Sequence, residues 1–207
     1  MKVEERFNKK LLVEGNDDQH VVWALCVKFK ITENFDVIDC ESIDGVKEEF
    51  SIRNKQLGTK IIGIIVDADT DLQARWNSLK NILVSKGFNI PDNLPKEGLI
   101  VENKTRKVGV WIMPDNNTNG MLEDFISFLV PEDDKLIPVV DNTLANIENQ
   151  KLNKYSDVHK SKAKIHTWLA WQENPGSPMG QSITKRYLST DDELCQNFVN
   201  WLRKLFN

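Results

Sequence analysis

The stretch Lys60–Asp71, KIIGIIVDADTD, decides the fold of this chain. A continuous apolar run of mostly β-branched residues ends abruptly in acidic residues at alternate positions, Asp67, Asp69 and Asp71. Such a run is typical of a strand that is covered on both faces, as in the parallel sheet of an α/β domain. Ligands of open α/β sheets bind at the carboxyl ends of the strands. The stretch therefore predicts a central strand with carboxylates at its functional end.

The segments on either side predict an alternation of strands and helices, which is typical of a doubly wound, mostly parallel sheet with right-handed crossovers. The expected strands are 10–13, 35–40 and 60–67, followed by a hairpin or neighbouring edge pair at 99–102 and 108–113. The expected helices begin after Asp17 or Asp18, after Gly45, at 72–86, and at 121–125. Beyond Pro131 we expect helices at about 144–149, 157–171 and 191–206, with a loop over 174–180. This organisation predicts an α/β domain over 1–130 and a helical C-terminal extension over 131–207, packed on the same domain.

Composition limits the kinds of partner. The 207 residues carry a net charge of −4, which argues against a strong non-specific grip on nucleic acid. A local basic patch is still available, because lysines cluster between Lys151 and Lys164. No apolar run approaches the roughly 20 residues of a membrane-spanning helix, and the charged N-terminus is unlike a signal peptide. With three scattered cysteines, the pattern predicts a reduced, cytoplasmic protein with no membrane partner. The oligomeric state is left open.

A second acidic residue follows the first expected strand. Glu14 precedes Gly15, where a strand, a tight turn and a helix succeed one another. Because parallel strands end at one edge of a sheet, Glu14 and Asp67 can converge there. Clustered carboxylates are the oxygen ligands that Mg²⁺ prefers. Two plainer interpretations stay open: Glu14 could receive amide hydrogens at a helix start, and the Asp67–Asp71 run could be an ordinary acidic loop.

These residues resemble the Toprim domain, the catalytic module of topoisomerases, bacterial primases and OLD-type nucleases. The two signatures are LLVEGNDD, which contains Glu14, and IIVDADTD, which contains Asp67. The whole chain is similar to a bacterial family of single-domain Toprim-like proteins, related to OLD nucleases, whose function is unassigned. Residues 113–125, 162–172 and 175–181 carry this closer match. The resemblance implies a Toprim (Rossmann-like) fold, with the sheet flanked by helices.

The resemblance also implies roles for the matching residues. Glu14 would be a metal ligand or the general acid/base at a phosphodiester. Asp67 and Asp69 would hold Mg²⁺ or Mn²⁺, and Asp71 would be an outer-shell or second-metal ligand. A bound cation of this kind orients a water and offsets charge on phosphoryl oxygens.

OLD-type nucleases use further acids and a basic residue after the Asp-x-Asp motif. The counterparts here are Glu123 and Asp124 as metal ligands, and Lys162 or Lys164 as the basic residue. Acids in the first turn of a helix are also favoured by the helix dipole, and a lysine cluster also fits a solvated helix face. Asp17 and Asp18 are interpreted as helix caps. The histidines, among them His166, have no evident partner in the sequence.

Three functions are consistent with these residues. The first is a Mg²⁺-dependent phosphodiester hydrolase acting on nucleic acid. The second is a non-catalytic module that binds a nucleotide or a partner protein. The third is phosphoryl or nucleotidyl transfer to a small molecule, since the same metal chemistry serves both kinds of transfer.

Overall fold

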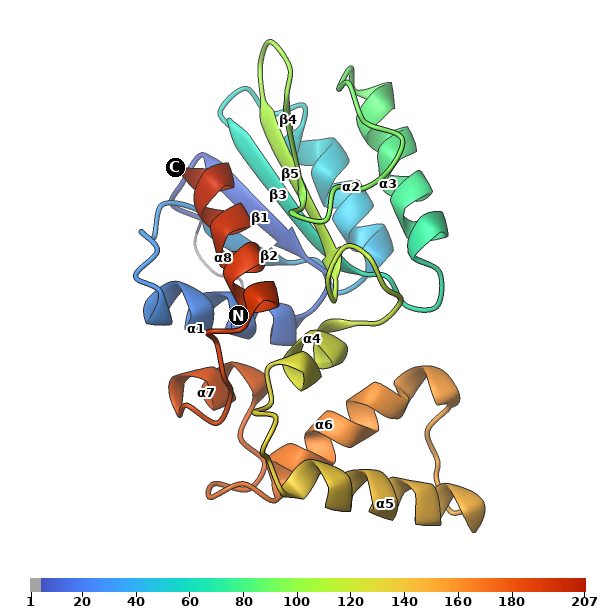
Figure 1. Cartoon of the computed structure of the whole chain (residues 1–207). Helices are drawn as coiled ribbons and strands as arrows, with labels where there is room; N and C mark the ends of the chain where they lie inside the picture. Colours follow the sequence, from blue (N-terminus) through green and yellow to red (C-terminus); the bar gives the residue numbers. More distant parts are fainter. Residues whose placement is uncertain (1–4) are drawn as a thin grey trace.

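A five-stranded sheet lies at the centre of the computed structural model, which describes residues 5–207 (Figure 1). Its strands are β1 (Lys9–Val13), β2 (Asp36–Asp39), β3 (Ile61–Asp67), β4 (Leu99–Glu102) and β5 (Lys107–Met113), in the order β2-β1-β3-β5-β4. Neighbouring strands pair in parallel, except that β4 is antiparallel to β5 at the edge. The α/β class, the mostly parallel sheet and the edge hairpin are therefore confirmed.

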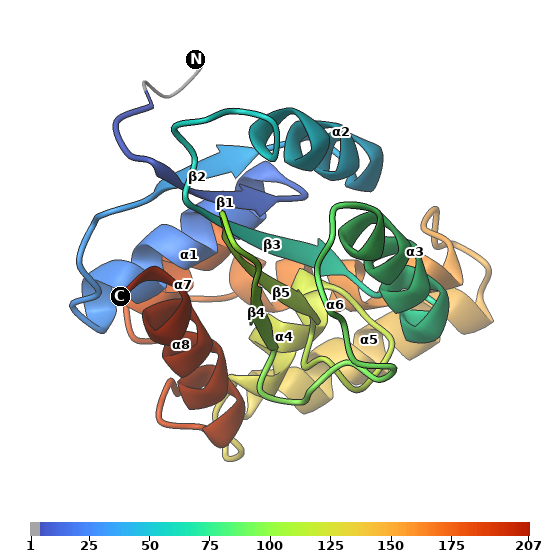
Figure 2. The same ribbon diagram turned by 90° about the horizontal axis from the view of Figure 1, so that it is seen from above.

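Helices cover both faces of this sheet (Figure 2). One hydrophobic cluster unites the sheet with α2 and α3, and the other unites the opposite face with α1, α8 and the remaining helices. The helices are α1 (Asn16–Lys28), α2 (Ile43–Arg53), α3 (Leu72–Ser85), α4 (Leu122–Phe128), α5 (Leu136–Asn149), α6 (Lys160–Ala170), α7 (Met179–Thr184) and α8 (Glu193–Phe206), with a 3₁₀ turn at Asp157–His159. Over residues 5–207, no helix combines the length and the apolar character needed to cross a bilayer.

The C-terminal third of the chain divides between two places. Helices α4, α5 and α6 lie beyond the carboxyl ends of the strands, whereas α8 returns to lie on the sheet (Figure 1). Two glycines on paired strands, Gly63 and Gly109, make room for α8. A Cβ at Gly109 would lie 2.6 Å from Cδ2 of Leu205, well inside van der Waals contact. The last helix is therefore part of the layer that covers the sheet.

Two expectations about the C-terminal region were wrong in detail. Helix α5 begins at Leu136, well before residue 144, because Pro138 lies in its first turn, where the missing amide hydrogen is not needed. The expected loop 174–180 contains the start of α7. This short helix packs on α1 through Gly180, where a Cβ would lie 2.6 Å from the His20 carbonyl oxygen. This close approach of α7 to α1 depends on tertiary packing and produces no periodic pattern in the sequence.

We predict that Gly109→Ala lowers the free energy of unfolding by about 1–3 kcal/mol, the usual cost of overpacking, because the added methyl group meets Leu205. The matched control is Gly58→Ala, since nothing lies within 4 Å of a Cβ at that position. Urea unfolding of both variants measures the difference. Equal stability of the two variants would contradict the close packing of α8 on the sheet.

Candidate functional site

The parallel pairing of β1 and β3 brings Glu14 and Asp67 together at one edge of the sheet. Glu14 follows β1 directly, and Asp67 is the last residue of β3. The Asp67 amide donates a hydrogen bond to Oε2 of Glu14, with a length of 3.1 Å. The expected convergence of these two residues is therefore confirmed.

Two helices that begin at the same edge add a buried carboxylate each. Asp18 lies in the first turn of α1 and Glu123 in the first turn of α4, with 6% and 4% of each residue exposed. Oδ2 of Asp18 accepts the Gly15 amide at 3.1 Å, but its buried Oδ1 has no hydrogen-bond partner among the described residues. We call Glu14, Asp18, Asp67 and Glu123 the acidic cluster. The sequence pattern predicts Asp18 only as a helix cap, because its burial at this edge depends on how α1 packs.

Burial and mutual repulsion strongly raise pKa values within the acidic cluster. Burial raises the pKa of Asp67 to about 9, and the charges of Asp18, Glu14 and Glu123 add to this shift. Burial, followed by the charges of Glu14 and Glu123, raises the pKa of Asp18 to about 8. The pKa of Glu14 is also raised by burial, although the Asp67 amide and the Arg75 charge oppose the shift. At neutral pH the cluster therefore retains protons unless a cation compensates its charge.

Helix α6 supplies positive charge on one side of the acidic cluster. Nζ of Lys162 lies 3.2 Å from Oε1 of Glu123, and this carboxylate is the main cause of the raised pKa of Lys162. One turn further along, Nε2 of His166 lies 4.0 Å from the same oxygen. His166 thus has a partner, Glu123, that the sequence does not predict. The only sequence signal was its spacing of four residues from Lys162, which puts both on one helix face.

The remaining predicted site residues make contacts of their own. Asp69 forms an ion pair with Arg75. Asp71 caps α3, because its Oδ1 accepts the Ala74 amide at 2.9 Å. Oδ2 of Asp124 accepts the Met121 amide at 2.9 Å, and its Oδ1 accepts the hydroxyl of Ser161. These three carboxylates border the acidic cluster and hold the surrounding loops in place.

Lys164 does not join the acidic cluster. Its ammonium group lies 2.8 Å from Oδ1 of Asp141 on α5, where it ties α6 to the neighbouring helix. Of the two lysines that the sequence offered as the basic residue, the structure brings only Lys162 to the predicted site.

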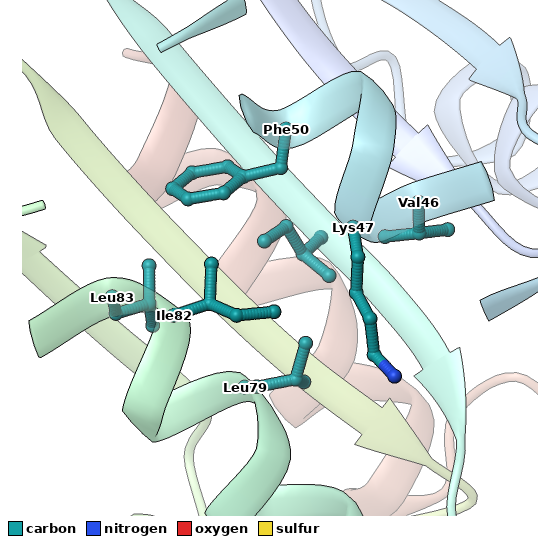
Figure 3. A pocket seen from close by; sticks show the side chains of 7 residues that line it. Val46, Lys47, Phe50, Leu79, Ile82 and Leu83 are labelled. Atoms are coloured by element: carbon teal, nitrogen blue, oxygen red, sulfur yellow. The ribbon is translucent and has the colours of Figure 1, made fainter. Parts of the chain in front are cut away.

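Two hollows differ in their relation to this site. An open hollow of about 410 Å³ begins at Asp69 and is lined by polar groups that include Asn119, Asp157 and Ser161. The other lies between α2 and α3 on one face of the sheet, where Phe50 and Leu79 are among the side chains that line it (Figure 3). This second gap is apolar and too small for a water molecule, so it is a packing gap.

The acidic cluster fits a hard divalent cation in its chemistry. Its donors are carboxylate oxygens, and the unpartnered Oδ1 of Asp18 is a buried acceptor that a cation would satisfy. Within residues 5–207, no three or more His, Cys, Asp or Glu side chains already form a metal-binding shell. Cation binding would therefore require these side chains to turn toward one another.

We predict that Asp18→Asn reduces the pH dependence of stability. The pKa of Asp18 in the folded protein, about 8, lies above the reference value of 3.8. The proton that the folded protein holds on Asp18 therefore contributes fully to the free energy of unfolding below about pH 4. This contribution is lost as the pH rises toward 8, by up to about 1.4 kcal/mol per pH unit for one proton.

Thermal melts of metal-free protein between about pH 5 and about pH 8 measure this slope. The melting temperature of the unsubstituted protein should fall more steeply with pH than that of Asp18→Asn. Asp157→Asn, at an exposed position, should retain the steep slope. Parallel slopes for all three proteins would contradict the raised pKa.

Comparison with known proteins gives a family but no activity. No curated protein and no solved structure matches the chain. A family model described as a protein of unknown function, DUF3226, matches residues 8–207. The match runs from the sheet through the last helix, so it includes the acidic cluster and both parts of the chain. This chain belongs to the DUF3226 family.

Proposed function

We propose that this chain is a Toprim-like phosphodiester hydrolase that uses Mg²⁺ or Mn²⁺ and acts on nucleic acid. The observation that carries the proposal is the acidic cluster at the carboxyl edge of β1 and β3, with Lys162 beside it. Buried carboxylates that repel one another are costly to fold, and pKa values perturbed in this way are common at functional sites. A divalent cation would remove the repulsion.

The Toprim assignment is supported by where its two motifs lie. The Glu-Gly motif follows β1, the Asp-x-Asp motif follows β3, and these strands are neighbours in the sheet. The motifs therefore meet, as a shared catalytic edge requires. Strand β5 continues the parallel sheet on the far side of β3, which makes β3 a central strand.

Each residue of the site has a chemical task in this proposal. Glu14, Asp18, Asp67 and Glu123 would hold the cation, which supplies charge stabilisation at the phosphoryl oxygens and lowers the pKa of a bound water. In the alternative role that the Toprim resemblance implies, Glu14 would accept a proton from the attacking water. Lys162 is half exposed and would neutralise charge on the substrate phosphate.

The substrate contact is local in this proposal. The chain carries a net charge of −4, which disfavours broad, non-specific electrostatic binding of nucleic acid. Several lysines near the site are already paired, for example Lys160 with Glu148 and Lys164 with Asp141. We infer that phosphate is bound by a few cations around the acidic cluster.

A second candidate is a non-catalytic module that binds a nucleotide or a partner protein. It is favoured by the contacts of Asp69, Asp71 and Asp124, because these three predicted metal ligands instead hold loops and helix ends in place. In this case the acidic edge would serve recognition. Phosphoryl transfer to a small molecule uses the same cation site and differs in its product.

We predict that the protein cleaves DNA or RNA only when Mg²⁺ or Mn²⁺ is present. Asp67→Asn should lower the cleavage rate at least about a hundredfold, since several kcal/mol of transition-state stabilisation depends on the cation. Lys162→Gln should lower it about tenfold, the effect of losing a charge-assisted hydrogen bond. Gel assays on labelled single-stranded and double-stranded DNA and RNA measure these rates.

Lys164→Gln is the matched control for Lys162→Gln, because both lysines lie on α6 but Lys164 pairs with Asp141. It should leave cleavage unchanged. Metal-independent cleavage, or no cleavage of any substrate, would contradict the hydrolase. Nucleotide binding without cleavage, weakened in Asp67→Asn, would instead support the binding module, whereas identical binding in both proteins would remove the acidic cluster from the explanation. Transfer products from nucleoside triphosphates would identify the transferase.

A further inference from the structure

Arg75 is an unusual cation at the edge of the acidic cluster. It lies in the first turns of α3, and only 14% of its side chain is exposed. A guanidinium group carries five N–H donors. Within residues 5–207, only Nη2 of Arg75 donates to a protein acceptor, the Oδ2 of Asp69. Among the described residues, its other donor nitrogens do not belong to the buried side-chain atoms that lack a partner, so they are open to solvent and available to a ligand.

The surroundings of Arg75 point to an anion that binds next to the acidic cluster. Its positive charge lowers the pKa of Glu14, so the guanidinium acts on the cluster directly. Helix α3 packs on one face of the sheet, whereas α6, which carries Lys162, lies beyond the carboxyl ends of the strands and belongs to the hydrophobic cluster of the opposite face. Arg75 and Lys162 therefore approach the acidic cluster from different sides. A phosphodiester lying across the cluster could reach both.

Asp69 is built so that its side chain can turn while its backbone stays fixed. Its φ of 53° lies in the left-handed region, which aspartate tolerates better than most residues. Reciprocal hydrogen bonds of 2.8 Å with Gly120 hold this backbone in place. The Asp69 side chain is 42% exposed, so its carboxylate has space to rotate away from Arg75.

We propose that the guanidinium of Arg75 binds a phosphate group, and that Asp69 covers it until a cation draws the Asp69 carboxylate away. A divalent cation attracts a carboxylate more strongly than a monovalent guanidinium does. Once released, the planar fork of Arg75 matches two phosphate oxygens. Cation and phosphate then favour each other's binding. The cation step rests on the proposed function, whereas the phosphate site at Arg75 does not.

Removing the Asp69 charge should expose the phosphate site without any metal. The probe is a fluorescein-labelled single-stranded DNA, followed by anisotropy in buffer containing EDTA. Asp69→Asn should bind it at least about tenfold more tightly than the unsubstituted protein, the factor for one charge-assisted hydrogen bond. Asp69→Asn combined with Arg75→Gln should lose this gain.

Two controls separate the phosphate site from general electrostatics. Asp157→Asn removes an equal charge from the same hollow and should give no gain. Lys80→Gln removes a cation from α3 that pairs with exposed Asp92, and should not weaken the binding of Asp69→Asn. A gain that persists without Arg75, or that Asp157→Asn reproduces, would overturn the proposal.

Competition identifies the source of the phosphate. Inorganic phosphate, a mononucleotide and an unlabelled oligonucleotide are each added to the complex of the probe with Asp69→Asn. The site is supported if any of them displaces the probe from Asp69→Asn and if that displacement depends on Arg75. The competitor that binds most tightly then indicates the class of ligand. Displacement by none would overturn the proposal.

A separate titration with Mn²⁺, followed by electron paramagnetic resonance, distinguishes this proposal from the proposed function. Absence of Mn²⁺ binding would contradict the hydrolase proposal but would leave the tighter metal-free DNA binding of Asp69→Asn as evidence for the phosphate site. Mn²⁺ binding without tighter DNA binding by Asp69→Asn would contradict only the proposed role of Arg75.

Discussion

Four carboxylates, two of them buried and two partly buried, meet at one edge of the sheet, and the free-energy cost of placing them there is the constraint on which the rest of the structure depends. The parallel register of β1 and β3 puts Glu14 beside the Asp67 amide. Helices α1 and α4 begin at the same edge, and each places an acid in its first turn, where the helix dipole favours negative charge. Amide groups offset part of the cost. The rest is met by retained protons, as the raised pKa values of Asp67 and Asp18 indicate, or by a bound cation.

The rest of the fold supports this edge from both faces. Helices α2 and α3 cover one face, and α3 brings Arg75 to the site. On the other face, Gly63 and Gly109 let α8 lie against the strands. Helix α6 lies beyond the carboxyl ends of the strands and brings Lys162 to Glu123. The family match over residues 8–207 spans all of these elements. The acidic edge is flanked by two cations, Arg75 and Lys162, that come from distant parts of the chain.

The sequence predicted the sheet and the convergence of Glu14 and Asp67, because buried parallel strands are continuous apolar runs and their carboxyl ends share one edge. It did not predict which side chains on the helices face that edge. Asp18 looked like a cap, and hydrogen bonding to Gly15 is indeed one of its roles, but its burial depends on how α1 packs. Lys162 and Lys164 were indistinguishable until the rotation of α6 about its axis was known. The residues of the site that lie on strands could be predicted, whereas those on helices depend on tertiary packing.

The most direct test of the cation site is a crystal structure of the protein soaked in Mn²⁺, with anomalous scattering measured at the manganese edge. The account predicts an anomalous peak between Glu14 and Asp67, with Asp18 turned toward it and Asp69 released from Arg75. The same soak of Asp67→Asn should show no peak at this position. Well-ordered crystals without anomalous density at the acidic cluster, or with the ion held elsewhere, would contradict the account.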